Sequence, residues 1–327
     1  MNTWGYNLRL SIFGESHGPA IGIIVDGLPP GEPVDPAGIA SEMRRRAPGQ
    51  DVTATARQEG DQVEILSGLL DGRTTNAPLC AVIRNRDARP EEYGAKLRPG
   101  HADWIALLKY GGFADQRGGG HFSGRLTAPL VFAGAVAKQS LARRGVAITG
   151  RAVRIGQTGD PEKMRDEILA AKADGDSVGG IVEAVATGAP IGLGQPFFAS
   201  FESVAASLLF AIPAVKGVEF GDGFALAGLR GSQANDQLTL ENGQIRALTN
   251  HNGGILGGLT NGEPIVVRAA VKPTPSIAKP QRTVDAETMR ETELSVRGRH
   301  DPCIVPRAVP VVEAALALSV LDCLLGL

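Results

Sequence analysis

The sequence predicts a fold in which α-helices and β-strands are mixed within one domain of 327 residues. Strand-like and helix-like segments follow one another along the chain, with no flexible linker or low-complexity stretch between them. The segment 178–194 (VGGIVEAVATGAPIGLG) also resembles 21–31 (IGIIVDGLPPG), since each is a Gly-, Ile- and Val-rich run that ends in a Gly/Pro turn. We therefore expect a single domain over 1–327 with two similar halves that meet near residue 146.

The first half is predicted to contain three strands and two helices. The strands are expected at 21–31, 61–70 and 77–86, and the helices at 33–47 and 121–145. Asp35 is placed to cap the first helix, with Pro36 at its first helical position. In the second helix we expect a kink at Pro129 and an end at Gly145.

The second half is predicted to contain four strands and three helices. The strands are expected at 146–156, 178–194, 224–230 and 263–271, and the helices at 160–175, 199–217 and 309–325. Asp160 followed by Pro161 is the clearest start signal among these helices.

Composition and charge exclude several classes of protein. A net charge of −2 argues against nucleic acid as a partner. The three cysteines, Cys80, Cys303 and Cys323, have no metal-binding or redox spacing and suit a reducing cytoplasm. The chain contains neither the apolar core of a signal peptide at its start nor a run of about 18 apolar residues, so we expect no membrane span.

The segment Gly14–Gly18 (GESHG) matches the G-x-S-x-G pattern of serine hydrolases. In those enzymes the serine follows several earlier strands and precedes a helix. Ser16 instead lies near the N-terminus, and Gly18-Pro19 and a strand-like run follow it. We therefore reject Ser16 as a nucleophile and take His17 as the functional residue of this segment.

Histidine and arginine occur together in loops. All five histidines lie in Gly-rich or charged segments, and their spacing is not that of a metal site, so we expect no metal. Arg98 precedes His101, Arg117 and Arg125 flank His121, and Arg299 precedes His300. Arginine binds carboxylate and phosphate, and histidine can donate a proton near neutral pH. These loops together predict a site for a small molecule with several negative charges.

Two further segments suit phosphate groups. The glycines of 117–125 (RGGGHFSGR) precede a predicted helix, whose free N–H groups attract anions. Gly119 to Gly124 has the spacing of a P-loop, but Arg125-Leu126 stands where Lys-Ser/Thr is needed, so we reject a P-loop. Lys272 and Thr274 in 270–281 (AVKPTPSIAKPQ) suit the phosphate-bearing tail of a cofactor.

Several blocks, in this order, resemble chorismate synthases. They are GESHGPAIGIIVDGLPPG, RPGHAD, YGGFADQRGGG, AVKGVEFGDGF, RGSQAND, NGGILGG and GRHDPC…RAVPVVEA, and they run from about residue 7 to the last predicted helix. The resemblance implies an α+β fold, a sandwich of helices and antiparallel β-sheets with internal pseudo-duplication. It also implies a cytoplasmic homotetramer.

The same resemblance implies a carbon–oxygen lyase of the shikimate pathway that acts on a phosphate. The family converts 5-enolpyruvylshikimate 3-phosphate to chorismate by anti-1,4-elimination of phosphate and a proton. The reaction needs reduced FMN without consuming it. NADPH enters only as a reductant of the flavin, and whether this chain reduces its own flavin is left open.

The resemblance also assigns roles to single residues. His17 matches the histidine that keeps the reduced flavin suitably protonated, His101 the acid that protonates the leaving phosphate, and Asp301 the aspartate that assists proton removal. The residues matched to substrate binding are Ser16, Arg46, Arg98, Arg125 and Arg299. The residues matched to FMN binding are Ser123, Ala214, Gly257, Lys272, Thr274, Ser276 and Arg299.

The chain departs from the family pattern at several positions. His121, Phe122, Gly124 and Leu126 differ from the common RSSARET, and Pro213 and Pro275 stand where Asn and Ser are common. Val52 replaces an arginine associated with dinucleotide or phosphate binding, which favours an enzyme that does not reduce its own flavin. These departures leave individual FMN contacts open.

Two other functions remain as alternatives. One is a flavin-free phosphohydrolase that uses His101 and the arginines. The other is an anion- or RNA-binding module centred on 42–49 (EMRRRAPG). The net charge and the 5% aromatic content argue against RNA, since single-strand binding relies on stacking.

Overall fold

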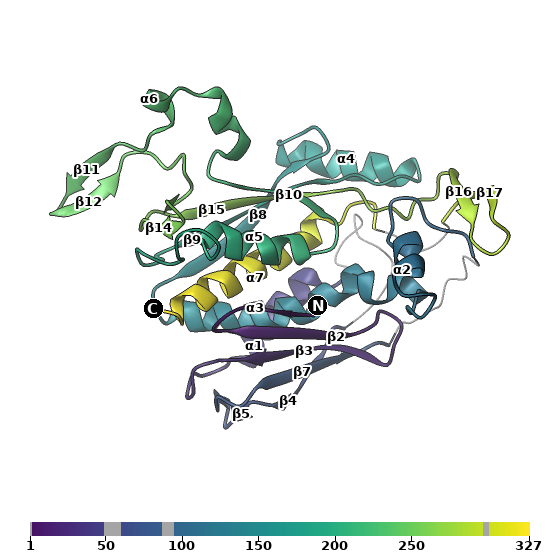
Figure 1. Cartoon of the computed structure of the whole chain (residues 1–327), viewed down its shortest axis with the longest axis horizontal. Coiled ribbons are helices and arrows are strands. Elements are labelled where there is room, and N and C mark those ends of the chain that lie inside the picture. Colours follow the sequence, from purple (N-terminus) through teal and green to yellow (C-terminus); the bar gives the residue numbers. More distant parts are fainter. Residues whose placement is uncertain (1, 49–59, 87–94, 297–300) are drawn as a thin grey trace.

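The computed structural model describes residues 2–48, 60–86, 95–296 and 301–327. Within these residues, two antiparallel sheets enclose a layer of helices (Figure 1). This arrangement confirms the predicted α+β fold with antiparallel sheets.

The first sheet is built from the N-terminal part of the chain. Its strand order is β1-β2-β3-β7-β4, with every pair antiparallel. The strands are β1 (Thr3–Trp4), β2 (Arg9–Gly14), β3 (Ala20–Asp26), β4 (Val63–Ser67) and β7 (Leu79–Arg84). A short hairpin, β5 (Leu69–Leu70) and β6 (Arg73–Thr74), connects β4 to β7.

The second sheet is built from residues after 146. Its order is β10-β15-β9-β8, again entirely antiparallel. The strands are β8 (Ala147–Ile155), β9 (Gly180–Thr187), β10 (Val215–Phe220) and β15 (Ile265–Val271). Helix α4 (Pro161–Ala173) lies on the outer side of this sheet (Figure 1).

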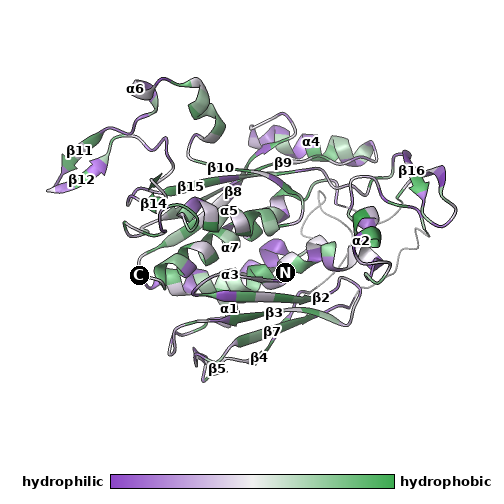
Figure 2. Cartoon of the chain, in the orientation of Figure 1, coloured by the Kyte–Doolittle hydropathy of each residue, from purple (hydrophilic) through white to green (hydrophobic). Residues whose placement is uncertain are grey.

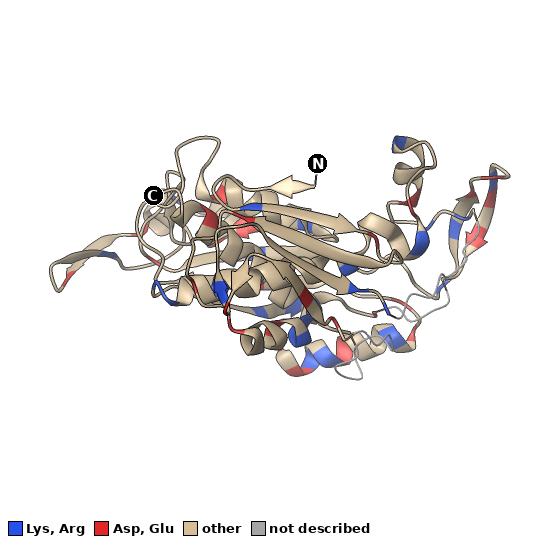
Figure 3. Ribbon diagram, turned by 90° about the horizontal axis from the view of Figure 1, so that it is seen from below, with Lys and Arg blue, Asp and Glu red and all other residues tan. Residues whose placement is uncertain are grey.

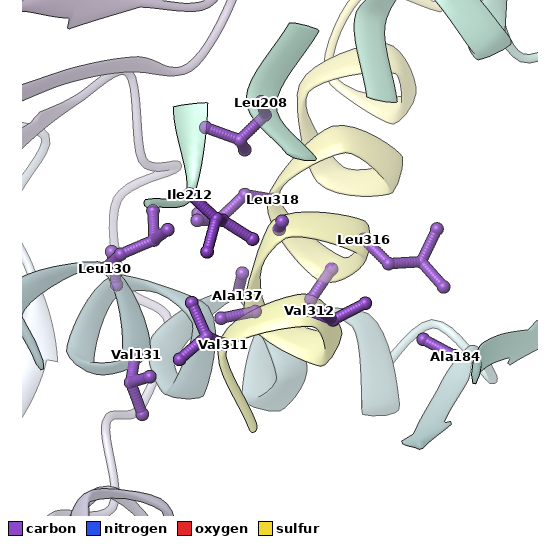
Figure 4. Packing of buried hydrophobic residues seen from close by; sticks show 14 of the residues in the cluster. Leu130, Val131, Ala137, Ala184, Leu208, Ile212, Val311, Val312, Leu316 and Leu318 are labelled. Atoms are coloured by element: carbon purple, nitrogen blue, oxygen red, sulfur yellow. The ribbon is translucent and has the colours of Figure 1, made fainter. Parts of the chain in front are cut away.

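Four helices fill the space between the sheets. They are α1 (Pro36–Arg46), α3 (Thr127–Ala142), α5 (Phe201–Ala211) and α7 (Val305–Leu324). Helices α3 and α7 pack on each other and are apolar on nearly every side, as expected of helices buried in a core (Figures 2 and 4). At their crossing Gly134 lies so close to α7 that a Cβ there would be 2.2 Å from the Cβ of Ala314. No helix in the described part of the chain is long and apolar enough to cross a membrane.

The remaining elements lie at the two ends of the molecule. Helix α2 (Asp103–Lys109) and the hairpin β16 (Gln281–Asp285) and β17 (Arg290–Leu294) lie at one end (Figure 1). The hairpin β13 (Ile255–Leu256) and β14 (Leu259–Thr260) lies at the other. Residues 222–251 form an arm that projects from the body and contains α6 (Gly231–Ala234), β11 (Leu238–Glu241) and β12 (Gln244–Ala247).

Both helix caps expected from the sequence are present. The Asp35 side chain accepts hydrogen bonds from the backbone N–H groups of Ala37 and Gly38 at the start of α1. The Asp160 side chain accepts one from Glu162 at the start of α4. In each case a proline follows the cap, where its missing N–H removes no helical hydrogen bond.

The largest differences between the predicted and observed elements concern four of them. The helix expected at 121–145 begins only at Thr127, because Ser123 is extended and Gly124–Leu126 form a 3₁₀ turn before it. Pro129 therefore lies in the first helical turn, where no hydrogen bond is lost and no kink arises.

The other three differences concern elements in the second half of the chain. The helix expected at 199–217 ends at Ala211, since Ala214 has a φ of +76° and the chain then enters β10. The strand expected at 224–230 is a 3₁₀ turn, Gly223–Gly228, with the side chain of Phe224 exposed to solvent. The final helix begins at Val305, four residues earlier than expected.

Candidate active site

His17 and His101 approach the same turn, formed by Gly118, Gly119 and Gly120. All three glycines have positive φ angles of +57°, +85° and +51°. A Cβ on Gly118 would lie 1.8 Å from Cε1 of His17, and one on Gly119 would lie 3.1 Å from Nε2 of His101. The bare backbone of the turn therefore lies against both imidazole rings, and only glycine fits there.

Ser16 is buried beside His17. Its backbone N–H donates to the carbonyl of Gly120 (3.1 Å), and its Oγ lies 3.2 Å from Nδ1 of His17. The turn that contains Ser16 joins the antiparallel strands β2 and β3 rather than a strand and a helix. It is therefore not a nucleophile elbow.

His101 lies in a hydrogen-bonded cluster with Asp103 and Arg98. Its Nδ1 is 2.6 Å from Oδ1 of Asp103. Arg98 donates to both carboxylate oxygens, Nε to Oδ2 and Nη2 to Oδ1, each at 2.7 Å. Burial raises the pKa of Asp103, but the hydrogen bonds from Arg98 and His101 outweigh this and hold the pKa well below its usual range.

A second buried cluster joins Arg46 and Arg125 through Asp61. Arg46 Nη1 donates to Oδ2 of Asp61 (2.8 Å), and Arg125 Nη1 donates to Oδ1 (2.6 Å). Arg125 also donates from Nε to Oδ1 of Asn85 (2.7 Å). Burial lowers the pKa of Arg46 to about 10, a value at which the guanidinium remains charged at neutral pH. Burial raises the pKa of Asp61, but the two arginines outweigh it and lower that pKa.

Asp301 joins this cluster through Arg307 of α7. Arg307 Nη1 donates to Oδ2 of Asp301, and its Nε donates to the backbone carbonyl of Arg46 (3.0 Å). The C-terminal segment is thus held beside the end of α1.

Several of the residues matched to FMN lie near Gly100, the residue before His101. Lys272 Nζ donates to the carbonyl of Gly100, and the backbone N–H of Lys272 donates to the carbonyl of Ala214 (2.9 Å). A cavity of about 270 Å³ is lined by Pro99, Gly100, Asp176, Ser177, Lys272, Pro273, Thr274, Pro275, Ile277 and Gln281. The buried Oγ1 of Thr274 has no hydrogen-bond partner in the described part of the chain. An unsatisfied hydroxyl beside a lysine fits a phosphate-bearing cofactor.

Other predicted residues differ in how they relate to this site. Ser123 lies close to Gly119, and its side chain accepts a hydrogen bond from the backbone N–H of Arg125 (3.4 Å). Ser276 is buried and lies in the chain between Pro275 and Ile277, which both line the cavity. Gly257 is in the β13–β14 turn, at the opposite end of the molecule from α2 (Figure 1), and does not lie at this site. Arg299 and Val52 lie outside the described residues.

The structure also shows the surroundings of three positions at which the chain departs from the family pattern. Nδ1 of His121 lies 2.9 Å from the carbonyl of Gly14, and its Nε2 lies 3.2 Å from Oδ1 of Asn2, so this histidine holds the N-terminus against the end of β2. Phe122 packs on Tyr110 with ring centroids 6.3 Å apart. Pro275 lines the 270 Å³ cavity, where no backbone N–H is available from it.

The arginines of 42–49 do not form a free basic surface. Arg45 makes ion pairs with Glu313 (2.6 Å) and Glu42 (2.9 Å), and Arg46 is buried against Asp61. Acidic and basic positions are interspersed along the ribbon in Figure 3 rather than separated by sign. These contacts argue against the RNA-binding alternative. Within the described residues no group of three or more His, Cys, Asp or Glu side chains could hold a metal ion.

Sequence reasoning missed four residues of the site: Asp61, Asn85, Asp103 and Arg307. Asp103 and Arg307 belong to the RPGHAD and RAVPVVEA blocks, and the position of Asp103 two residues after His101 is a signal that could have been used. No sequence pattern pointed to Asp61 or Asn85, because only the folded chain brings them to Arg125.

Comparisons with known proteins relate the chain to one family. The family model for chorismate synthase matches residues 8–325. The chain is 50% identical to the chorismate synthase of Thermococcus kodakarensis, covering 98% of this chain and 97% of that protein. It is also 50% identical to that of Archaeoglobus fulgidus, covering 99% and 97%. A solved chain described as the crystal structure of chorismate synthase matches with a TM-score of 0.78 and 30% identity, covering 98% of this chain and 93% of that one.

Proposed function

The chain belongs to the chorismate synthase family, and we propose that it converts 5-enolpyruvylshikimate 3-phosphate to chorismate in the shikimate pathway. As a member of this family it is an enzyme, a carbon–oxygen lyase that acts on phosphates. The proposed reaction is the anti-1,4-elimination of phosphate and a proton. The observation that carries the proposal is the convergence of His17 and His101 on the Gly118–Gly119 turn, beside buried arginines.

The substrate carries a phosphate and two carboxylates, which require cationic partners. Arg98, Arg125 and Arg46 supply positive charge from the two buried clusters. The proposed elimination breaks the C3–O bond, and its electron pair leaves with the phosphate. His101 protonates this leaving group from Nε2, the ring nitrogen that does not face Asp103.

Removal of the C6 proton completes the elimination. Asp301 is proposed to assist this step, and Arg307 orients its carboxylate. Ser16 is proposed to lie beside the substrate next to His17.

The residues around the 270 Å³ cavity fit reduced FMN. Lys272, Thr274 and Ser276, with Ala214 and Ser123 nearby, would hold it, and Thr274 offers the unsatisfied hydroxyl. When bound, reduced FMN supplies transient electron density to the substrate and a basic nitrogen for the C6 proton. His17 is proposed to hold the proton that keeps the reduced flavin in its active form. NADPH is proposed to act only as the source of reduced flavin.

We also propose that the protein is a cytoplasmic homotetramer. The arm at 222–251 exposes large apolar side chains to solvent, which supports a buried contact in an assembly. These side chains are Phe224, Leu229, Leu238, Leu240, Ile245 and Leu248. Light scattering should give a mass of four 34.0 kDa chains.

The decisive experiment is an anaerobic assay of phosphate release from 5-enolpyruvylshikimate 3-phosphate, with and without reduced FMN. We expect release only with reduced flavin, and His101→Ala should lose at least about 100-fold in turnover while still binding flavin, as expected when a general acid is removed. His251→Ala is the matched control, because His251 also pairs with an aspartate, Asp222 (2.5 Å), but lies at the base of the arm.

Two outcomes would contradict the proposal. No turnover with reduced flavin would exclude the elimination. Phosphate release that is independent of flavin would support the phosphohydrolase alternative instead.

A further inference from the structure

We infer that Asp103 is a positioning residue for His101: its carboxylate fixes the proton on Nδ1, so that Nε2 is the atom that exchanges a proton with the substrate. This inference rests on the acid role proposed for His101. The resemblance to the family assigns no role to Asp103.

The geometry determines which nitrogen carries the proton. An ionised carboxylate can only accept hydrogen bonds, so the nitrogen 2.6 Å from Oδ1 of Asp103 must be the donor. That nitrogen is Nδ1. The other nitrogen, Nε2, lies on the side of the ring that faces the backbone of Gly119.

The carboxylate of Asp103 is itself held in place. Arg98 donates to it from Nε (2.7 Å), from Nη2 (2.7 Å) and from its backbone N–H (3.1 Å). The side chains of Arg98 and Asp103 are only 7% and 9% exposed. Asp103 is also the first residue of α2, where the helix dipole favours a negative charge. The carboxylate therefore cannot turn away from the ring without losing several hydrogen bonds.

The charges around His101 have opposing effects. Asp103 stabilises the protonated ring, whereas Arg98, whose Nη2 is 3.1 Å from Nδ1, opposes it. Lys272 donates to the carbonyl of Gly100, the residue before His101, and His17 lies on the other side of the glycine turn. Removal of the negative charge at Asp103 leaves only cationic neighbours among these groups.

The test is Asp103→Asn, which keeps the shape of the side chain and removes its charge. Three cationic or protonatable groups then remain beside His101, so its protonated form loses the one anionic partner among these groups. An acid must be protonated to act, so activity is present below the pKa of His101 and is lost above it. In the holoenzyme, the alkaline limb of kcat/KM against pH should therefore shift down by about one unit.

A readout that needs neither substrate nor flavin separates this inference from the proposed reaction. Diethylpyrocarbonate modifies neutral imidazole, so its rate with His101 against pH, followed by peptide mass spectrometry, gives the pKa directly. Asp222→Asn is the matched control, since it removes the carboxylate 2.5 Å from His251. It should leave the pH dependence of the modification of His101 and the turnover unchanged.

A pKa of His101 that is unchanged in Asp103→Asn would overturn the inference, whether or not the enzyme catalyses the proposed elimination. The unmodified protein gives a second test that does not depend on folding of the variant. Imidazole ¹⁵N chemical shifts should show Nδ1 protonated in neutral His101. A proton on Nε2 would equally overturn the inference.

Discussion

At the scale of single residues, the site depends on glycines, which have no side chain. Gly118 and Gly119 bring bare backbone against His17 and His101, and their positive φ angles are ones that other residues rarely adopt. The sequence indicated both histidines and the glycine run. It did not indicate that the run separates the two rings, because residues 17, 101 and 118 meet only in the folded chain.

Gly118→Ala should therefore reduce activity without unfolding the protein. Its Cβ would lie 1.8 Å from Cε1 of His17, so the ring must move. We expect kcat/KM in the anaerobic assay to fall about 100-fold, as when a catalytic group is displaced by about 1 Å. Gly124→Ala is the control in the same loop, since a Cβ there meets nothing within 4 Å and its φ is not positive. Equal activities of the two variants would contradict this role of Gly118.

At the scale of elements, the crossing of α3 and α7 holds the two sheets together. Apolar composition predicted both helices, and Asp35 and Asp160 correctly marked the starts of two others. Boundaries were less predictable where the chain contains glycines with positive φ or a non-glycine residue such as Ala214 in the same conformation. At Ala214 this conformation is imposed by neighbouring segments, and no local sequence pattern predicts it.

Gly134→Ala tests this crossing. In an isolated helix the change would favour the helix by about 1 kcal/mol. Here its Cβ would lie 2.5 Å from Cα of Ala314, and the backbone of α7 cannot move aside easily. We expect the free energy of unfolding in urea to fall by about 1–3 kcal/mol.

Gly38→Ala in α1 is the control for this substitution. A Cβ at position 38 would lie 3.0 Å from Nε2 of Gln139 and 3.1 Å from Oδ2 of Asp35, so these side-chain ends need to move by only a few tenths of an ångström and no backbone is displaced. The stability of this variant should be unchanged or slightly higher. An unchanged free energy of unfolding in Gly134→Ala would contradict this prediction, since it would show that α3 and α7 can move apart without loss of stability.

At the scale of the whole molecule, buried carboxylates hold distant elements together. Glu313 of α7 accepts from Arg45 of α1 and pairs with Lys138 of α3. Burial raises the pKa of Glu313, but Arg45 and Lys138 outweigh it and lower the pKa, as the arginines do for Asp61 and Asp103. The two ion pairs of Glu313 connect residues more than 100 positions apart, so no local sequence pattern predicts them.

The lowered pKa values predict acid sensitivity. Because these carboxylates have lower pKa values in the folded state than in the unfolded chain, they contribute stability above the usual carboxyl range near pH 4. This contribution is lost as the pH falls through that range toward the folded pKa values. Urea unfolding at pH 7, 5, 4 and 3 should show a steep loss below about pH 5.

Glu313→Gln gives the matched comparison for this pH dependence. It should lower the free energy of unfolding at pH 7 by about 1–3 kcal/mol, because the three hydrogen bonds that Glu313 accepts from Arg45 and Lys138 weaken. It should also make the loss at acid pH shallower. An identical pH dependence in both proteins would show that Glu313 does not contribute to it.

The sequence by itself determined the class of fold, the longer helices, most strands of the two main sheets, and the family with its histidines and arginines. These features follow from local patterns of apolar residues, caps and glycines, and from ordered motifs. Only the tertiary structure decided the charged partners of these residues. Asp103 pairs with His101, Asp61 pairs with Arg46 and Arg125, and Arg307 pairs with Asp301. The physical reason is that a buried charge needs a partner close in space, and the fold supplies that partner wherever it lies in the chain.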